Sequence, residues 1–210
     1  MDTSNSLQDL GQFIAKEIGT DILRWSVVHG ELMMTVEKGS ISRILPYLRD
    51  SETLQFSQLM DVCGVDYLGR TPRFDVVYNL LSLVYNKRIR LKIEVEDGMS
   101  VPSVSAVYSS ANWWEREVFD LYGIPFEDHP DLRRILTDYG FEGYPLRKDF
   151  PLTGYVEVRY DEEKQKVVYE SVKLPQAFRT FDFNSPWEGM ECAVQALEPK
   201  HTEDGREVSE

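Results

Sequence analysis

The chain has 210 residues, 42% of them hydrophobic and 28% charged, which is typical of a globular protein with one sizeable core and excludes a disordered or collagen-like chain. An excess of 36 acidic over 23 basic residues leaves a net charge of −13, so nucleic acid is not an expected partner, because a phosphate backbone attracts basic surfaces. The two cysteines, Cys63 and Cys192, are too few to build an iron–sulfur cluster or a structural zinc site from cysteines alone.

The sequence carries no sign of a membrane span, a targeting segment or a metal site. Its longest strongly apolar stretch, residues 76–85, has about half the length that a membrane helix needs. The first residues have neither the basic and apolar parts of a secretory signal nor the Arg-rich character of a mitochondrial presequence. The histidines His29, His129 and His201 show no metal-binding spacing, so we expect them at turns or on the surface.

Three elements are expected in the first fifty residues. Apolar residues at helical spacing, followed by Gly19, predict a helix over residues 7–18. Two β-favouring runs on either side of His29-Gly30 predict a hairpin over residues 22–37. Ser40 can cap a further amphipathic helix that follows it.

Three strands are predicted next, over residues 55–67, 73–85 and 88–95, with a turn at Asn86-Lys87. In the last strand charged residues alternate strictly with apolar ones, so we expect one face of the strand to be buried and the other to be exposed to solvent. Helices and antiparallel strands in this order predict an α+β fold, with a two-layer mixed or antiparallel sheet and helices on one face. A ferredoxin-like arrangement is the expected form.

An apolar stripe at helical spacing runs from Val104 to Leu121 and predicts a core-facing helix within residues 102–123, with a possible break at Ser109 or Ser110. The face opposite this stripe carries Trp113, Arg116 and Asp120. Two interpretations of Trp113 stay open: it lies in an interface with another protein, where large aromatic residues are enriched, or it is a surface residue under a loop. The neighbouring carboxylates Glu115 and Glu117 lie about 160° apart on the helix, so they do not form a catalytic dyad.

The composition changes after Tyr122. Seven of the ten prolines follow this residue, helical periodicity disappears, and aromatic residues recur as far as Trp187. An extended, aromatic segment needs a surface on which to bury its rings, so we expect an arm that wraps a partner, the chain itself, or both. We therefore divide the chain into an α+β domain (residues 1–123), an arm (124–198) that contains a short hairpin at 161–170, and a disordered acidic tail (199–210).

Basic pairs in the arm are the strongest binding feature. Arg133-Arg134 and Arg147-Lys148 can clamp carboxylates of a partner, because guanidinium groups bind carboxylates through two hydrogen bonds. Pairing with aspartates of the arm itself is the equal alternative. Motifs for a dinucleotide, a P-loop or an esterase nucleophile are absent from the sequence.

One long motif resembles a known family. Residues 114–136, WEREVFDLYGIPFEDHPDLRRIL, are similar to a motif of the thirty-kilodalton subunit (the C subunit in bacteria) of the proton-pumping NADH:quinone oxidoreductase, respiratory complex I. Residues 144–152, YPLRKDFPL, and 178–188, FRTFDFNSPWE, resemble the C-terminal arm of the same family.

The resemblance implies a subunit without a cofactor of its own in a complex that uses FMN, Fe–S clusters, NADH and quinone. It implies that the chain packs beside the forty-nine-kilodalton quinone-site subunit and the adjacent Fe–S subunit in a hetero-oligomer. The expected location is peripheral, on the cytoplasmic face of the bacterial inner membrane, with the matrix face of the mitochondrial inner membrane as the alternative. The expected interface residues are Trp113, Glu115, Arg116, Glu117, Asp120, His129, Arg134, Arg147, Lys148, Phe181, Phe183 and Trp187.

Two other function classes remain open from the sequence. One is a stand-alone enzyme that uses the carboxylates of the helix at residues 110–122, and it predicts an active monomer with a concave pocket there. The other is an adaptor domain with a partner of unknown kind. We expect no catalytic, cofactor-binding or metal-binding residue in this chain.

Overall fold

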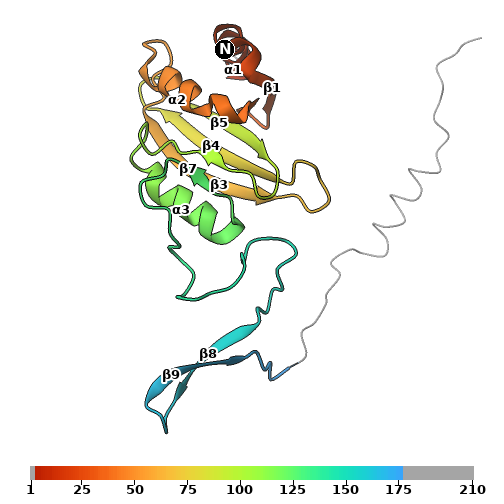
Figure 1. Cartoon of the computed structure of the whole chain (residues 1–210). Helices are drawn as coiled ribbons and strands as arrows, with labels where there is room; N and C mark the ends of the chain where they lie inside the picture. Colours follow the sequence, from red (N-terminus) through yellow and green to blue (C-terminus); the bar gives the residue numbers. More distant parts are fainter. Residues whose placement is uncertain (1–2, 177–210) are drawn as a thin grey trace, which may run out of the picture. The chain divides into compact units, whose positions relative to one another are not determined.

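The structure, a computed structural model, describes residues 3–176, with side chains from Ser6 onward (Figure 1). Its helices are α1 (Thr3–Ile18), α2 (Ile41–Asp50) and α3 (Ala111–Tyr122), with the short 3-10 turns Gly19–Asp21 and Lys38–Ser40. Its strands are β1 (Ile22–Val28), β2 (Glu31–Val36), β3 (Gln58–Asp66), β4 (Phe74–Ser82), β5 (Lys87–Val95), β6 (Val101–Pro102), β7 (Phe126–Glu127), β8 (Val156–Asp161) and β9 (Lys166–Ser171).

The first five strands form one mixed sheet in the order β1-β2-β5-β4-β3. The central pair β2 and β5 runs parallel, with Met34 opposite Leu91, and the other neighbours are antiparallel. β6 and β7 form a second, short parallel pair, and β8 and β9 form a hairpin.

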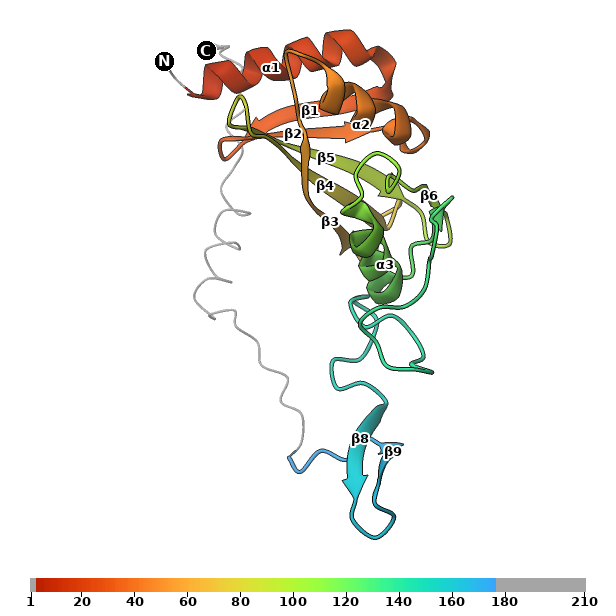
Figure 2. The ribbon, with the colours of Figure 1, turned by 90° about the vertical axis from the view of Figure 1, so that its left-hand side faces the viewer.

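All three helices cover the same face of the five-stranded sheet (Figure 2). On α1, Gly11 lies so close to the sheet that an added Cβ would be 2.6 Å from the Trp25 ring, and on β3 an added Cβ at Gly64 would be 2.6 Å from the Tyr122 ring of α3. In β4 and β5, which lie between these two contacts, every second side chain points to the helices, and those such as Tyr78 and Leu91 are fully buried. The predicted α+β class is confirmed, whereas the ferredoxin-like form stays a prediction.

Most predicted elements match the structure in place and type. The hairpin turns at His29-Gly30, where both residues have positive φ angles of 51° and 77°, as a two-residue turn of this kind requires. The turn between β4 and β5 differs from the prediction: it occupies residues 83–86 instead of Asn86-Lys87. Asn86 closes it with a φ of 48°, a left-handed conformation that asparagine tolerates better than most residues.

The predicted helix over 102–123 is shorter than the stripe indicates, because only α3 is regular helix. The expected break is confirmed, with Ser110 at the N-cap position of α3. Before the break, the segment keeps a single turn, in which the N–H groups of Val107 and Tyr108 donate to the Val104 carbonyl at 2.9 and 3.0 Å. Tertiary bonds hold this turn in place: the backbone N–H of Val104 donates to Glu115, and the hydroxyl of Tyr108 donates to the carbonyl of Phe56 at 2.6 Å.

The chain divides into two compact units, Met1–Val156 and Glu157–Glu210. The first unit thus continues well past Gly123, where α3 ends in the left-handed conformation with a φ of 75°. A hairpin in the arm is confirmed as β8 and β9, but its first strand begins at Val156, five residues before the predicted start at residue 161. Phe181, Phe183, Trp187 and the predicted tail 199–210 lie outside the described residues. Between residues 3 and 176, no helix is long and apolar enough to cross a membrane.

Candidate functional site

The polar face of α3 is covered by the chain itself. Glu115 and Asp120 are completely buried and Arg116 is nearly so. Residues 129–137 provide most of their polar partners, so the first part of the arm folds back onto the helix. This part of the molecule unites five residues that the sequence singled out: Glu115, Arg116, Asp120, His129 and Arg134.

Asp120 binds the arm through five hydrogen bonds. Its Oδ2 accepts from three successive backbone N–H groups, those of Ile135, Leu136 and Thr137, at 3.0, 2.7 and 2.8 Å. Its Oδ1 accepts from the Thr137 hydroxyl at 2.6 Å and from the Arg134 guanidinium at 3.0 Å. Burial alone would raise the pKa of Asp120, but the hydrogen bonds from Thr137, Leu136 and Ile135 lower it to about 2. The carboxylate is therefore charged and fully occupied.

Arg116 and Arg134 add further hydrogen bonds between α3 and the arm. Arg116 does not pair with Asp120, four residues along the helix, but donates to the carbonyls of Arg133 and Arg134 at 3.1 and 3.2 Å. Besides Asp120, Arg134 donates to the Gly143 carbonyl at 3.0 Å and lies 5.3 Å from the centre of the Tyr144 ring. Both guanidinium groups are engaged within the chain.

His129 and Glu115 form a second buried contact beside α3. The side chain of His129 is fully buried, and the residue lies between the turn residues Asp128 and Pro130, so of the two predicted positions the turn is found and the surface is not. Its Nε2 lies 2.9 Å from the Asn112 carbonyl and its Nδ1 accepts from the Asp131 N–H at 3.1 Å, which assigns the proton to Nε2 in a neutral ring. Glu115 accepts from the Ser103 hydroxyl at 2.6 Å and the Val104 N–H at 2.7 Å, and burial raises its pKa.

A second ionic cluster ties residues 147–149 to the end of the sheet. Arg73 forms a bidentate pair with Asp66 at 2.7 and 2.8 Å and also reaches Asp149 at 2.8 Å. Arg147 forms a bidentate pair with Asp97 at 3.1 and 2.9 Å and donates to the Tyr122 carbonyl at 2.7 Å. Hydrogen bonding from Arg73 lowers the pKa of Asp66.

Of this second cluster, Arg147 and Asp149 were predicted from the sequence as candidates for pairing, whereas Asp66, Arg73 and Asp97 were not. Asp66 and Arg73 stand at the end of β3 and just before β4, which are antiparallel neighbours, and this adjacency across the turn was the available signal. For Arg134 and Arg147, the structure gives partners within the chain. Lys148 is exposed, and its backbone N–H donates to Asp66 at 2.7 Å.

The surface around these clusters exposes several large apolar side chains among charged ones. Trp113 on α3 is 68% exposed, and the attached segment 131–155 displays Leu136, Tyr139 and Leu152 at 63%, 99% and 86% exposure. Large apolar side chains fixed in exposed positions are typical of surfaces that bind other proteins. Glu117, on the same face of α3 as Trp113, is half-buried.

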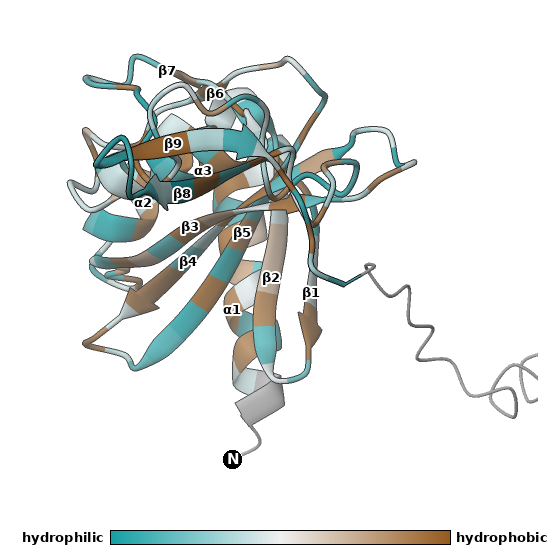
Figure 3. Cartoon of the chain, turned by 90° about the horizontal axis from the view of Figure 1, so that it is seen from below, coloured by the Kyte–Doolittle hydropathy of each residue, from teal (hydrophilic) through white to brown (hydrophobic). Residues whose placement is uncertain are grey.

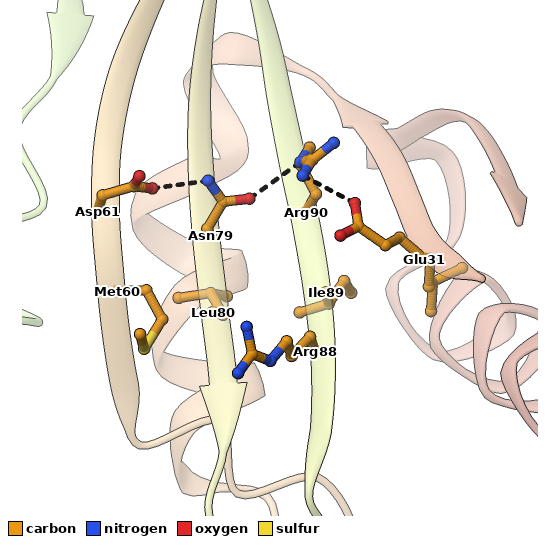
Figure 4. A pocket seen from close by; sticks show the side chains of 9 residues that line it. Glu31, Met60, Asp61, Asn79, Leu80, Arg88, Ile89 and Arg90 are labelled. Atoms are coloured by element: carbon orange, nitrogen blue, oxygen red, sulfur yellow. Dashed lines mark hydrogen bonds and ion pairs between the residues drawn. The ribbon is translucent and has the colours of Figure 1, made fainter. Parts of the chain in front are cut away.

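The face of the sheet without helices has a hollow of about 260 Å³ (Figure 4). A row of polar side chains crosses four strands at its edge: Asn79 donates to Asp61 at 2.6 Å and accepts from Arg90 at 3.0 Å, and Arg90 pairs with Glu31 at 2.7 Å. Every member of the row has a partner, so the row stabilises strand pairing and offers no free acid or base. Over residues 3–176 the structure has no group of three or more residues that could hold a metal ion.

Comparisons with known proteins agree with this picture. The family model described as "Respiratory-chain NADH dehydrogenase, 30 Kd subunit" matches residues 34–156. The chain is 59% identical over 187 residues to a protein of Paramagnetospirillum magneticum, a match that covers 89% of this chain and 94% of that protein. It is 55% identical over 194 residues to one of Rhodospirillum rubrum, covering 92% and 91%. Both relatives are named as the C subunit of NADH-quinone oxidoreductase.

Proposed function

The chain belongs to the 30 Kd subunit family of respiratory-chain NADH dehydrogenase, and we propose that it is a structural subunit without a cofactor in the peripheral arm of complex I. In this role it braces neighbours that hold FMN and the Fe–S clusters and carry electrons from NADH to quinone. One observation carries the proposal: the buried charged residues Arg116 and Asp120 of α3 bind the attached segment, while large apolar side chains such as Trp113 remain exposed.

The occupied carboxylates favour a structural role over catalysis. A general acid or base must reach a substrate proton, but both oxygens of Asp120 are bound to groups of the chain. Glu115 is buried and bound to Ser103 and Val104. The stand-alone enzyme would require these groups to be released into an open pocket at the cost of the contacts that hold residues 131–137.

The expected partners are the large quinone-site subunit and the adjacent Fe–S subunit. We place their contacts on the exposed apolar residues, with Trp113 first, because the charged candidates Arg116, Asp120 and Arg134 are engaged within the chain. Glu117 and Lys148 extend this surface with polar groups, and we assign the aromatic residues Phe181, Phe183 and Trp187 of the arm to the same interface. The location proposed is peripheral, on the cytoplasmic face of the bacterial inner membrane.

A native gel of mildly solubilised membranes tests the proposal. The gel is stained for NADH dehydrogenase activity and probed for this chain. We expect the chain in a very large, active band, and we expect Trp113→Ser to reduce its share in that band. The matched control Trp25→Phe keeps the aromatic contact between β1 and α1 and should stay in the band. A chain found only at its monomer mass in the soluble fraction would refute the proposal.

A further inference from the structure

Two segments that are distant in the sequence meet beside the first turns of α3. β6 and β7 run parallel next to this helix (Figure 3), so the residues that follow the two strands leave the pair side by side. Ser103 and Val104 follow β6 and donate to Glu115 of the helix. His129 follows β7, and its ring lies between the helix and the arm.

The ring of His129 joins α3 to the arm through both of its nitrogens. Nε2 donates to the carbonyl of Asn112, in the first turn of the helix, at 2.9 Å, and Nδ1 accepts from the backbone N–H of Asp131 at 3.1 Å. Both bonds require the neutral ring with its proton on Nε2, because a ring that carries two protons is a donor at both nitrogens. The side chain is fully buried, so solvent does not replace either bond while the segment is in place.

A second proton on this ring is incompatible with its bond to Asp131. The proton would come from solvent and bind the Nδ1 lone pair, the same lone pair that accepts the Asp131 N–H. Two N–H groups would then point at each other, so the N–H of Asp131 must leave as the ring becomes a cation. A buried donor without an acceptor is costly, and the backbone at Asp131 therefore has to move toward solvent.

The groups that face the ring include an acid on each side. Glu115 of α3 lies 3.8 Å from Nε2, and burial raises the pKa of Glu115. On the arm, hydrogen bonding from Arg133 lowers the pKa of Asp131, and Arg116 is the next cation that this carboxylate faces. From β4, Tyr78 faces Glu115, and burial raises the pKa of Tyr78 so far that it stays neutral. The contact that opposes a second proton on the ring is therefore the Asp131 N–H.

We propose that His129 and the N–H of Asp131 form a pH-sensitive switch, in which a second proton on the ring releases residues 130–132 from the start of α3. The release ends there, because Arg116 binds the carbonyl of Arg133 and Asp120 binds residues 135–137. The pKa of Asp120 is about 2, so Asp120 keeps its charge while a histidine titrates.

The switch lies next to the exposed residue of α3. Trp113 directly follows Asn112, whose carbonyl binds the His129 ring, and is 68% exposed. Release of residues 130–132 would change the surface beside Trp113, so the shape of this surface would depend on pH. The switch is a property of this chain by itself and goes beyond the structural role, on which it does not depend.

Nuclear magnetic resonance of the full chain tests the switch, because it follows the ring and the backbone separately. The chemical shifts of the ring nitrogens show where the protons of His129 lie. The hydrogen-exchange protection factor of the Asp131 amide, which corrects for the intrinsic effect of pH on exchange, reports its bond to the ring.

Between about pH 8 and about pH 5, the range in which histidine ordinarily changes its charge, we expect His129 to gain a second proton. We expect the protection factor of Asp131 to fall at least about tenfold with the same midpoint. The amide of Ile135, which is bound to Asp120, should keep its protection factor within about twofold. The exposed His29, at the β1–β2 turn, is the internal reference, because its own proton uptake should not affect Asp131.

His129→Asn is the matched variant. An asparagine oxygen can accept from the backbone N–H two residues further on, as it does in turns, but the side chain does not titrate. We therefore expect the Asp131 protection factor of this variant to stay within about twofold over the same pH range.

Four results would each overturn the proposal. They are a His129 ring with its single proton on Nδ1 at about pH 8, a ring that is still neutral at about pH 5, an Asp131 amide that stays protected while the ring gains its proton, and a loss of protection in His129→Asn equal to that of wild type. The first three are measured on wild type, so they decide the question even if the variant does not fold.

Discussion

Asp120 is the residue whose loss should most directly release the arm from α3. The change Asp120→Asn keeps the shape of the side chain but removes the charge, and it replaces one accepting oxygen by an NH2 group that faces N–H donors. The pKa of Asp120 is about 2, against an ordinary 3.8, and at about 1.4 kcal/mol per pKa unit this difference corresponds to ~2.5 kcal/mol of stability. We therefore expect the variant to lose about 3 kcal/mol at pH 7, including the mismatched donor.

The sign of the pH dependence gives a second, independent expectation. A carboxyl group with a lowered pKa in the folded state stabilises the protein above its unfolded pKa of about 4 and loses this contribution as the pH falls through about 2. The gap between wild type and variant should thus be full at pH 7 and shrink below pH 4.

Urea unfolding of the full chain, followed by tryptophan fluorescence at pH 7, 4 and 3, measures both quantities. Asp128→Asn is the control, because Asp128 is exposed and has a φ of 59°, which asparagine also adopts. An Asp120→Asn variant whose stability at pH 7 lies within about 0.5 kcal/mol of wild type, the range of an ordinary surface substitution, would refute the assignment of Asp120 as the anchor of residues 135–137. A gap that does not change with pH would refute it as well.

Three further changes test the packing around the site. Gly64→Ala should cost about 1–3 kcal/mol in urea unfolding, because its Cβ would lie 2.6 Å from the Tyr122 ring; an unchanged midpoint would show that α3 is free to move. Gly123→Ala should cost more than about 1 kcal/mol, since φ is 75° there and the Cβ would lie 2.5 Å from the Tyr144 ring, and a stabilised variant would contradict this geometry. Tyr78→Phe should leave stability unchanged or raise it by about 1 kcal/mol, because the buried Tyr78 hydroxyl has no hydrogen-bond partner within the described part of the chain. A loss of stability above about 1 kcal/mol would show that this hydroxyl does have a hydrogen-bond partner.

The sequence predicted the local elements well because their signals are short-range. The His29-Gly30 turn, the alternating residues of β5 and the left-handed Gly123 each depend on a few neighbours along the chain. It also identified residues 114–136 as the distinctive segment, by resemblance, and the family model covers them.

The roles of the charged residues were decided by the tertiary structure. From the sequence, Arg134 and Arg147 could bind either carboxylates of a partner or aspartates of the arm. In the structure they bind Asp120 and Asp97, two aspartates that precede the arm. Distant pairing depends on the path of the chain, which composition and periodicity do not determine.

The sequence by itself thus determined which segments become helices and hairpins, because backbone conformation follows from local residue types and their spacing. Only the tertiary structure decided that β2 pairs in parallel with β5 and that residues 131–137 cover the polar face of α3. These contacts join residues far apart in the chain, and their stability comes from burial and charge pairing that exist only after the chain has folded.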